Sequence, residues 1–138
     1  MEQEKPIRVV AVDDDEAILD IYENGLSSDK CEIKTFSSPK KAKEFFTGAK
    51  PEEIPDVILM DIMMPGEDGI SLMSDIRAMP ASAHVPVLAI SGLNDAATLN
   101  DAMLFGAMDY LVKPFDLDIL LAKIKKAAEI SRKRAPKT

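Results

Sequence analysis

Short runs of apolar residues alternate along the chain with longer segments in which apolar residues recur every three or four positions. The short runs predict buried β-strands, and the longer segments predict amphipathic helices. The predicted strands cover residues 7–12, 31–36, 57–60, 85–90 and 109–113. The predicted helices cover residues 17–26, 39–49, 69–79, 95–106 and 117–128. The pattern therefore predicts five βα units in strict alternation.

The helix boundaries carry recognisable start and stop residues. Asn94 and Asp116 are expected as N-caps of the fourth and fifth helices, and Gly106 as the C-terminal cap of the fourth. Apolar residues at helical spacing indicate which side of each helix packs on a core. In the first helix they are Ala17, Ile18, Ile21, Tyr22 and Leu26, and in the fourth Leu99, Met103 and Leu104 are expected to face inward.

Strict alternation of strands and helices implies an α/β fold, an open parallel sheet with helices on both faces and right-handed crossovers. In such sheets ligands bind beyond the carboxyl ends of the strands, where the strand order reverses. Polar residues that interrupt the apolar pattern stand at these ends: Asp13, Asp14, Asp61, Ser91 and Lys113. We expect them to converge on one site.

Asp61 is the most informative of these residues, because it lies between the apolar run 57–60 and three further apolar residues. A carboxylate buried there is costly unless it is paired or coordinates a cation. An Asp that merely caps the next turn is the simpler alternative. The acidic residues after the first strand and the lysine after the fifth favour a functional site.

The predicted residue set suits phosphoryl chemistry. Carboxylates gathered in one cleft repel one another unless a cation compensates, and an all-oxygen site with room for water suits Mg²⁺. Aspartate can act as a covalent nucleophile toward phosphorus. A metal ion and Lys113 would stabilise the charge on the transferred group.

Length and composition indicate one globular domain. The chain has 138 residues, of which 46% are hydrophobic and 30% charged. Neither a signal-like apolar region nor a run long enough to span a membrane is found in the sequence, so a cytoplasmic protein without a membrane partner is expected. Cys31 is the one cysteine and is expected to be a small buried hydrophobe.

The net charge of −7 is unevenly distributed, because the segment 123–138 has seven lysines and arginines and one glutamate. An acidic body disfavours direct contact with nucleic acid. The basic end suits the negative end of a helix dipole, and contact with nucleic acid or an acidic partner is the alternative.

Four motifs in order resemble the receiver domains of bacterial two-component response regulators, over residues 6–130. They are the acidic pair Asp13-Asp14, the stretch 61–69, Ser91-Gly92, and Lys113-Pro114-Phe115. The resemblance implies a five-stranded parallel sheet with strand order 2-1-3-4-5 and a flavodoxin-like, doubly wound fold. It implies a receiver domain over residues 1–130, followed by a basic tail over 131–138.

By this resemblance, Asp61 is the phosphoacceptor that takes a phosphoryl group from a phosphohistidine. Asp13, Asp14 and Asp61, with the backbone carbonyl of Met63, are implied as the Mg²⁺ site. Lys113 is implied as the partner of the phosphoryl oxygens.

The resemblance also implies a switch. Ser91 would bond the phosphoryl group and Tyr110 would change rotamer, altering the surface of the fourth helix, fifth strand and fifth helix. The Lys113–Pro114 peptide bond is expected to be cis. Implied partners are a sensor histidine kinase or histidine phosphotransfer protein and a downstream protein target, with the chain a monomer or a phosphorylation-dependent dimer.

Two other functions compete with the receiver, which would catalyse only its own phosphorylation and dephosphorylation. A phosphohydrolase would use Asp61 with Mg²⁺, but it needs a second acid near the nucleophile, and position 63 is Met. A docking module with a vestigial site would not require the intact polar set. Met63 and Leu93 are expected to flank the phosphoryl group and slow its hydrolysis, although both residues simply packing is an equal alternative.

Overall fold

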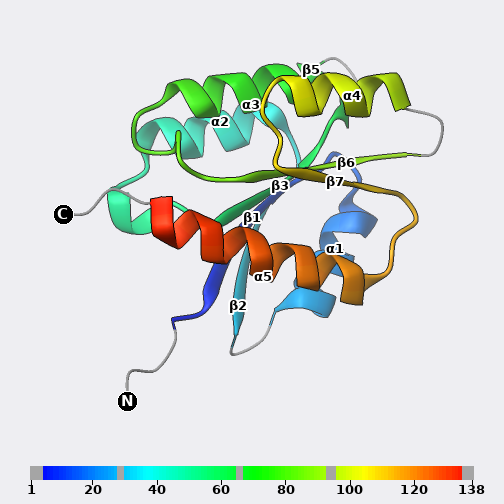
Figure 1. Ribbon diagram of the computed structural model, residues 1–138, viewed down its shortest axis with the longest axis horizontal. Helices are drawn as coiled ribbons and strands as arrows, with labels where there is room; N and C mark the ends of the chain where they lie inside the picture. The colour runs from blue at the N-terminus through cyan, green and yellow to red at the C-terminus, as the bar shows by residue number, and fades with distance from the viewer. Residues whose placement is uncertain (1–4, 28–29, 65–66, 93–95, 135–138) are drawn as a thin grey trace.

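The computed structural model describes residues 5–27, 30–64, 67–92 and 96–134 (Figure 1). Its strands are β1 (Ile7–Val12), β2 (Cys31–Phe36), β3 (Val57–Asp61), β4 (Met63–Met64), β5 (Glu67–Asp68), β6 (Val87–Ser91) and β7 (Asp109–Val112). Its helices are α1 (Glu16–Leu26), α2 (Pro39–Gly48), α3 (Gly69–Ala78), α4 (Ala96–Leu104) and α5 (Leu117–Arg134), with a short 3₁₀ turn at Pro51–Glu53.

The main sheet has five parallel strands in the order β2-β1-β3-β6-β7. With β6 and β7 as the fourth and fifth predicted strands, this is the predicted order 2-1-3-4-5, and the α/β prediction is confirmed. The two-residue strands β4 and β5 form a small antiparallel pair directly after β3, which the sequence pattern did not reveal.

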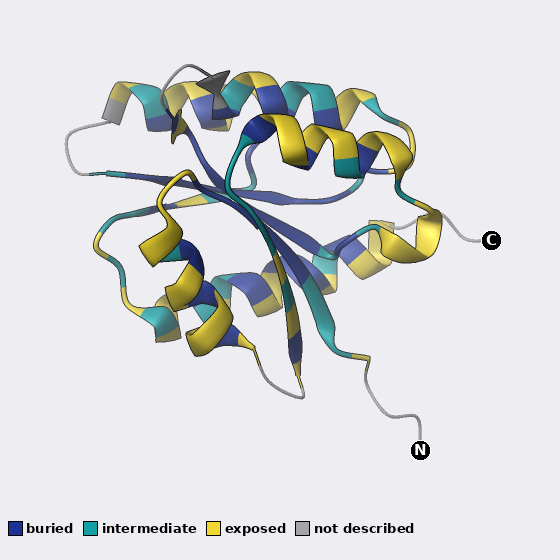
Figure 2. Cartoon of the chain, turned by 180° about the vertical axis from the view of Figure 1, so that it is seen from behind, coloured by how far each residue is buried: buried dark blue, intermediate teal, exposed yellow. Residues whose placement is uncertain are grey.

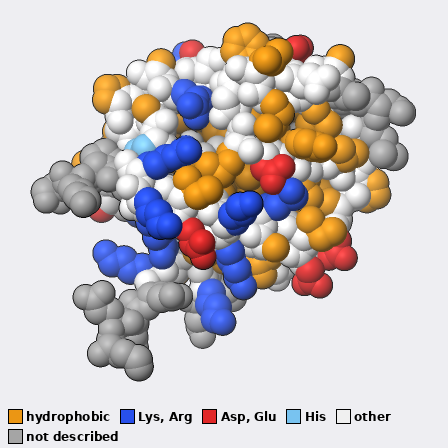
Figure 3. Space-filling view, in the orientation of Figure 1, with side chains coloured by type: hydrophobic (Ala, Val, Ile, Leu, Met, Phe, Trp, Pro, Cys, Tyr) orange, Lys and Arg blue, Asp and Glu red, His pale blue; other side chains and the backbone are white. Residues whose placement is uncertain are grey.

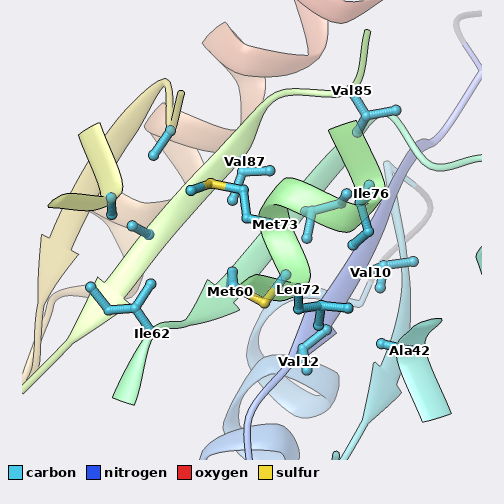
Figure 4. Close-up of a cluster of buried hydrophobic side chains, with 14 of the residues drawn as sticks. Val10, Val12, Ala42, Met60, Ile62, Leu72, Met73, Ile76, Val85 and Val87 are labelled. Atoms are coloured by element: carbon cyan, nitrogen blue, oxygen red, sulfur yellow. The ribbon is translucent and has the colours of Figure 1, made fainter. Parts of the chain in front are cut away.

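Helices α2, α3 and α4 cover one face of the sheet, and α1 and α5 cover the other (Figure 1). The buried sides of the helices face the strands, and β3 and β6 are buried along their whole length (Figure 2). On the first face Met73 and Ile76 of α3 pack against Met60 and Val87 of the central strands (Figure 4). A strand buried on both faces explains the unbroken apolar runs in the sequence.

Two predictions about inward-facing residues were wrong. In α4, Leu99 and Ala102 are buried, whereas Met103 is 40% exposed and Leu104 is 83% exposed. In α1, Ile21 is 45% exposed, and the buried residues are Leu19, Tyr22 and Leu26. Both helices have adjacent apolar residues, so the apolar pattern fits more than one helical face.

The predicted caps are present where the structure describes them. The Asp116 carboxylate accepts a hydrogen bond from the Asp118 N–H at 2.8 Å at the start of α5. Gly106 has φ +108°, and the Ala107 N–H reaches back to the Ala102 carbonyl at 3.0 Å, which ends α4. The predicted cap Asn94 lies outside the described residues. Within the described part of the chain, no helix combines the length and apolarity needed to cross a bilayer.

Candidate phosphoryl-transfer site

Parallel pairing brings the polar strand ends to one edge of the sheet. Val12 of β1 is in register with Met60 of β3, so the next residues, Asp13 and Asp61, lie side by side. On the other side of β3, Ser91 of β6 is in register with Val112 of β7, and the Lys113 N–H donates to the Ser91 carbonyl at 2.7 Å. The predicted convergence therefore follows from strand register alone.

Lys113 bridges the two buried carboxylates. Its Nζ lies 2.9 Å from Oδ2 of Asp13 and 3.5 Å from Oδ2 of Asp61. Asp13 is 1% exposed and Asp61 is 4% exposed. Two carboxylates this deeply buried require a cation, and Lys113 supplies one positive charge against two negative charges.

Backbone donors hold both carboxylates in place. The Asp15 N–H donates to Oδ1 of Asp13 at 2.9 Å, and the Met63 N–H donates to Oδ1 of Asp61 at 3.0 Å. In each case the donor is two residues further along the chain, as in an Asx turn. The Oδ2 atoms of Asp13 and Asp61 face Lys113.

Asp13, Asp14 and Asp61 form an acidic cluster, in which one carboxylate oxygen from each lies within 4.8 Å of the others. Asp14 is exposed, so the cluster is open to water on one side. Mg²⁺ prefers oxygen ligands and retains several waters, and an open cluster of carboxylates meets both requirements. These residues fit the predicted magnesium site, and the carbonyl of Met63 as a further ligand stays a prediction.

The electrostatics of the cluster favour binding of a cation. Burial raises the pKa of Asp61 from 3.8 to about 6, and the negative charge of Asp13 adds to this effect. Burial opposes the charged form of Lys113, but Asp13 and Asp61 together outweigh it and raise the pKa of its ammonium. Lys113 is therefore firmly protonated, while Asp61 is held in its charged form only weakly until a further cation arrives.

The Asp61 pKa predicts a pH-dependent change in stability. In the metal-free protein, we expect Asp61→Asn to raise the free energy of unfolding by about 2 kcal/mol near pH 8. The native state binds the Asp61 proton more tightly than the unfolded chain does. The ionised carboxylate therefore costs stability above the folded pKa, and this cost disappears below about pH 4. Urea unfolding in EDTA across this pH range measures the difference.

The exposed Asp20→Asn variant is the control, with an expected change within about 0.5 kcal/mol. An Asp61→Asn protein that is less stable than wild type near pH 8 would contradict the pKa argument.

The two predicted switch residues lie in different environments. Ser91 is fully buried at the end of β6, whereas Tyr110 on β7 is 46% exposed. The Lys113–Pro114 peptide bond is cis, as expected. Met63 is 51% exposed beside Asp61, and its predicted companion Leu93 lies outside the described residues.

The sequence reasoning missed an apolar pocket of about 310 Å³ next to the acidic cluster. It is lined by Ile18, Ile21, Lys113, Pro114, Phe115 and Leu117. Phe115 stacks on the buried Tyr22 ring at 6.1 Å between centroids, which joins the loop after Lys113 to α1. The sequence carried no signal for this pocket, because Ile18 and Ile21 fit the apolar side of the first helix that was expected to pack on the core.

Comparison with known proteins identifies the family of the chain. The family model of the response regulator receiver domain matches residues 9–125. The chain is 40% identical over 119 residues to the transcriptional regulatory protein PrrA of Mycobacterium bovis, covering 86% of this chain and 48% of PrrA. It is 31% identical over 118 residues to the response regulator PleD of Caulobacter vibrioides, covering 86% of this chain and 25% of PleD.

Solved structures give the same result. A response regulator structure from Chloroflexus aurantiacus matches with a TM-score of 0.79 and 27% identity, covering 91% of this chain and 99% of that chain. The chain spans half or less of the length of PrrA and PleD. The fold, the site and the matched family model lead to one conclusion: the chain belongs to the response regulator receiver domains of two-component systems.

Proposed function

We propose that the chain is a phosphoacceptor switch in which Asp61 takes a phosphoryl group from a phosphohistidine in a Mg²⁺-dependent reaction. The observation that carries this proposal is the position of Lys113, which contacts both Asp13 and Asp61 within an acidic cluster. Nucleophile, cation and metal ligands are then all present within one site.

In the proposed step, a carboxylate oxygen of Asp61 forms a bond to phosphorus while the bond between phosphorus and the histidine nitrogen breaks. The Met63 N–H holds Oδ1 of Asp61, which leaves Oδ2, on the Lys113 side, to attack. Lys113 stabilises the charge on the phosphoryl oxygens. Asp13, Asp14, Asp61 and the Met63 carbonyl would hold Mg²⁺, which would supply further charge neutralisation there.

The proposed switch follows from the charge that phosphorylation adds. A phosphoryl group adds nearly two negative charges and three acceptor oxygens, so the Ser91 hydroxyl turns toward it. The space released at the end of β6 then accepts the ring of Tyr110, which is 46% exposed without phosphorylation. Partners that bind the α4-β7-α5 surface select one of the two states.

We further propose that the phosphohistidine donor docks on the apolar pocket formed by α1 and the loop after β7. Lys113 lines this pocket and also contacts Asp61, so a partner seated there brings its histidine to the acceptor. Ile21 is 45% exposed at this pocket, and such an apolar side chain is suited to burial by a partner.

Ile21→Glu is therefore expected to slow transfer from a phosphorylated sensor kinase by about tenfold or more, because a charge is placed in an apolar contact. Phosphorylation by acetyl phosphate, which needs no docking surface, is expected to stay at the wild-type rate. Rapid-quench transfer assays with both donors measure the two rates.

Ile119→Glu is the matched control, since Ile119 is 53% exposed on α5 and does not line the pocket. Equal loss of kinase transfer in both variants, or loss with acetyl phosphate, would rule out docking at Ile21.

A receiver, a phosphohydrolase and a docking module differ in the fate of phosphate. With Mg²⁺ and acetyl phosphate, the receiver retains up to one phosphoryl group per chain, with slow release because the exposed apolar Met63 flanks the site. A hydrolase releases phosphate far in excess of protein, and a docking module takes up none. Measuring bound and free phosphate over time separates the three functions.

The proposed physiological partners are a sensor histidine kinase or histidine phosphotransfer protein and a downstream protein target. The chain acts as a monomer or as a phosphorylation-dependent dimer, with no direct contact to nucleic acid. The receiver domain is assigned to residues 1–130 and the basic tail to 131–138, the first four residues of which continue α5.

A further inference from the structure

A basic cleft lies at the end of the sheet opposite the acidic cluster. It has a volume of about 310 Å³ and is lined by Lys5, Ile7, Lys30, Lys125, Ala128, Glu129 and Arg132. Ile7 begins β1, whereas Asp13 follows the end of this strand. The strand rise of about 3.3 Å per residue puts the cleft roughly 20 Å from Asp13. The cleft is therefore separate from the phosphoryl site.

Cations from three elements converge on this cleft. Lys5 precedes β1, Lys30 precedes β2, and Lys125 and Arg132 lie on α5, so the described lining holds four positive residues and one negative residue, Glu129. Lysine and arginine side chains gather over α5 in Figure 3. The negative end of the α5 dipole explains why basic residues stand in the last turn of this helix. Lys5 and Lys30 lie outside α5, so the dipole does not explain them.

Arg132 lines one side of the cleft, and hydrogen bonds hold its guanidinium group in place. Its Nη2 donates to the carbonyls of Lys5 at 3.1 Å and Pro6 at 3.0 Å, and it pairs with Oδ2 of Asp56 at 3.1 Å. These contacts join the end of α5 to the segment before β1. The backbone of Lys5 is thus held beside the end of α5.

The residues that line the cleft restrict the classes of ligand that it can bind. None of the described residues that line the cleft is aromatic, so they offer no ring for a base to stack on. The apolar part of the described lining consists of Ile7, Ala128 and the lysine stems, which is little for insertion into a membrane. The net charge of −7 disfavours an extended phosphate backbone but permits a short anionic segment on a local basic site.

We propose that this cleft binds an acidic segment of a partner protein, whose Asp or Glu carboxylates pair with Lys5, Lys30 and Lys125. The segment binds at the opposite end of the sheet from Asp61, so a partner held there leaves the phosphoryl site accessible. This contact is independent of phosphorylation and does not rest on the function proposed above.

The test is fluorescence anisotropy with the full chain and a fluorescein-labelled hexaglutamate peptide, at about 50 mM salt so that charge interactions are only partly screened. We expect saturable binding that the double variant Lys30→Glu/Lys125→Glu weakens about tenfold or more. Lys40→Glu/Lys41→Glu is the matched control, because it makes the same charge change at exposed positions of α2. It is expected to bind within about twofold of wild type.

Thermal unfolding of each variant checks that the fold is retained. Absence of saturable peptide binding would overturn the proposal. An equal loss of peptide affinity in both double variants would also overturn it, because it would indicate general charge attraction and not a binding site. A thymidine oligonucleotide of equal charge is the competing probe. Tighter binding of this oligonucleotide, with the same dependence on Lys30 and Lys125, would identify a nucleic-acid site and overturn the acidic-segment proposal.

Discussion

Lys113→Met is expected to slow phosphorylation of Asp61 by acetyl phosphate by about 10²–10³-fold, the usual effect of removing one preorganised positive donor from a transferring group. Lys113 is the described cation that contacts both Asp13 and Asp61, at 2.9 and 3.5 Å. Its charge also lowers the pKa of Asp61 against the larger raising effect of burial. Removing this charge raises the pKa of Asp61, so rates are compared across pH, and the plateau at high pH separates the loss of the Lys113 contact from the loss of ionised Asp61.

Two further variants separate catalysis from folding. Lys113→Met leaves the buried Asp13 without its partner, so Mg²⁺ must be present and circular dichroism must show a native fold. Lys113→Arg keeps the charge and is expected to recover part of the rate. Lys43→Met removes an exposed lysine that pairs with Asp75 at 3.2 Å and is expected to leave the rate unchanged. A folded Lys113→Met protein within about threefold of wild type would contradict the assigned role.

Gly69→Ala is expected to destabilise the fold by about 3 kcal/mol, at the upper end of overpacking costs. A Cβ at Gly69 would overlap the carbonyl oxygen of Asp61 and lie 2.7 Å from Cα of Ile62. Both atoms belong to the backbone, so no side chain can rotate away. Gly69 thus allows α3 to start directly against the end of β3, and its replacement would also displace the Asp61 carboxylate.

Gly48→Ala provides the control, because a Cβ there meets nothing within 4 Å. In a helix this change is expected to stabilise by about 0.5–1 kcal/mol. Urea unfolding of both variants gives the two free energies. A Gly69→Ala protein as stable as wild type would show that the backbone around Asp61 yields more easily than the structure indicates.

The strands and the site could be predicted from sequence because both depend on a simple pattern. Central strands buried on both faces appear as unbroken apolar runs, and residues that follow such runs in a parallel sheet must meet at one edge. Asp13, Asp61 and Lys113 lie together for this reason. The prediction needed no knowledge of side-chain geometry.

Helix faces were harder to predict, because several apolar residues on α1 and α4 are exposed. Leu104 is 83% exposed, and Ile21 lines a pocket beside Lys113 instead of the core. The basic cleft was also not predictable, since Lys5, Lys30 and Lys125 are far apart in sequence and meet only where β1, β2 and α5 come together. Contacts of this kind depend on tertiary packing, which no local pattern encodes.

Intact-mass measurement decides whether Asp61 is the phosphoacceptor. Wild type and Asp61→Asn are incubated in parallel with Mg²⁺ and acetyl phosphate, and the modified residue is located by peptide mapping. We predict one added phosphoryl group on wild type, located at Asp61, and none on Asp61→Asn or on wild type in EDTA. An adduct of equal yield on Asp61→Asn, or one mapped to another residue, would contradict the claim.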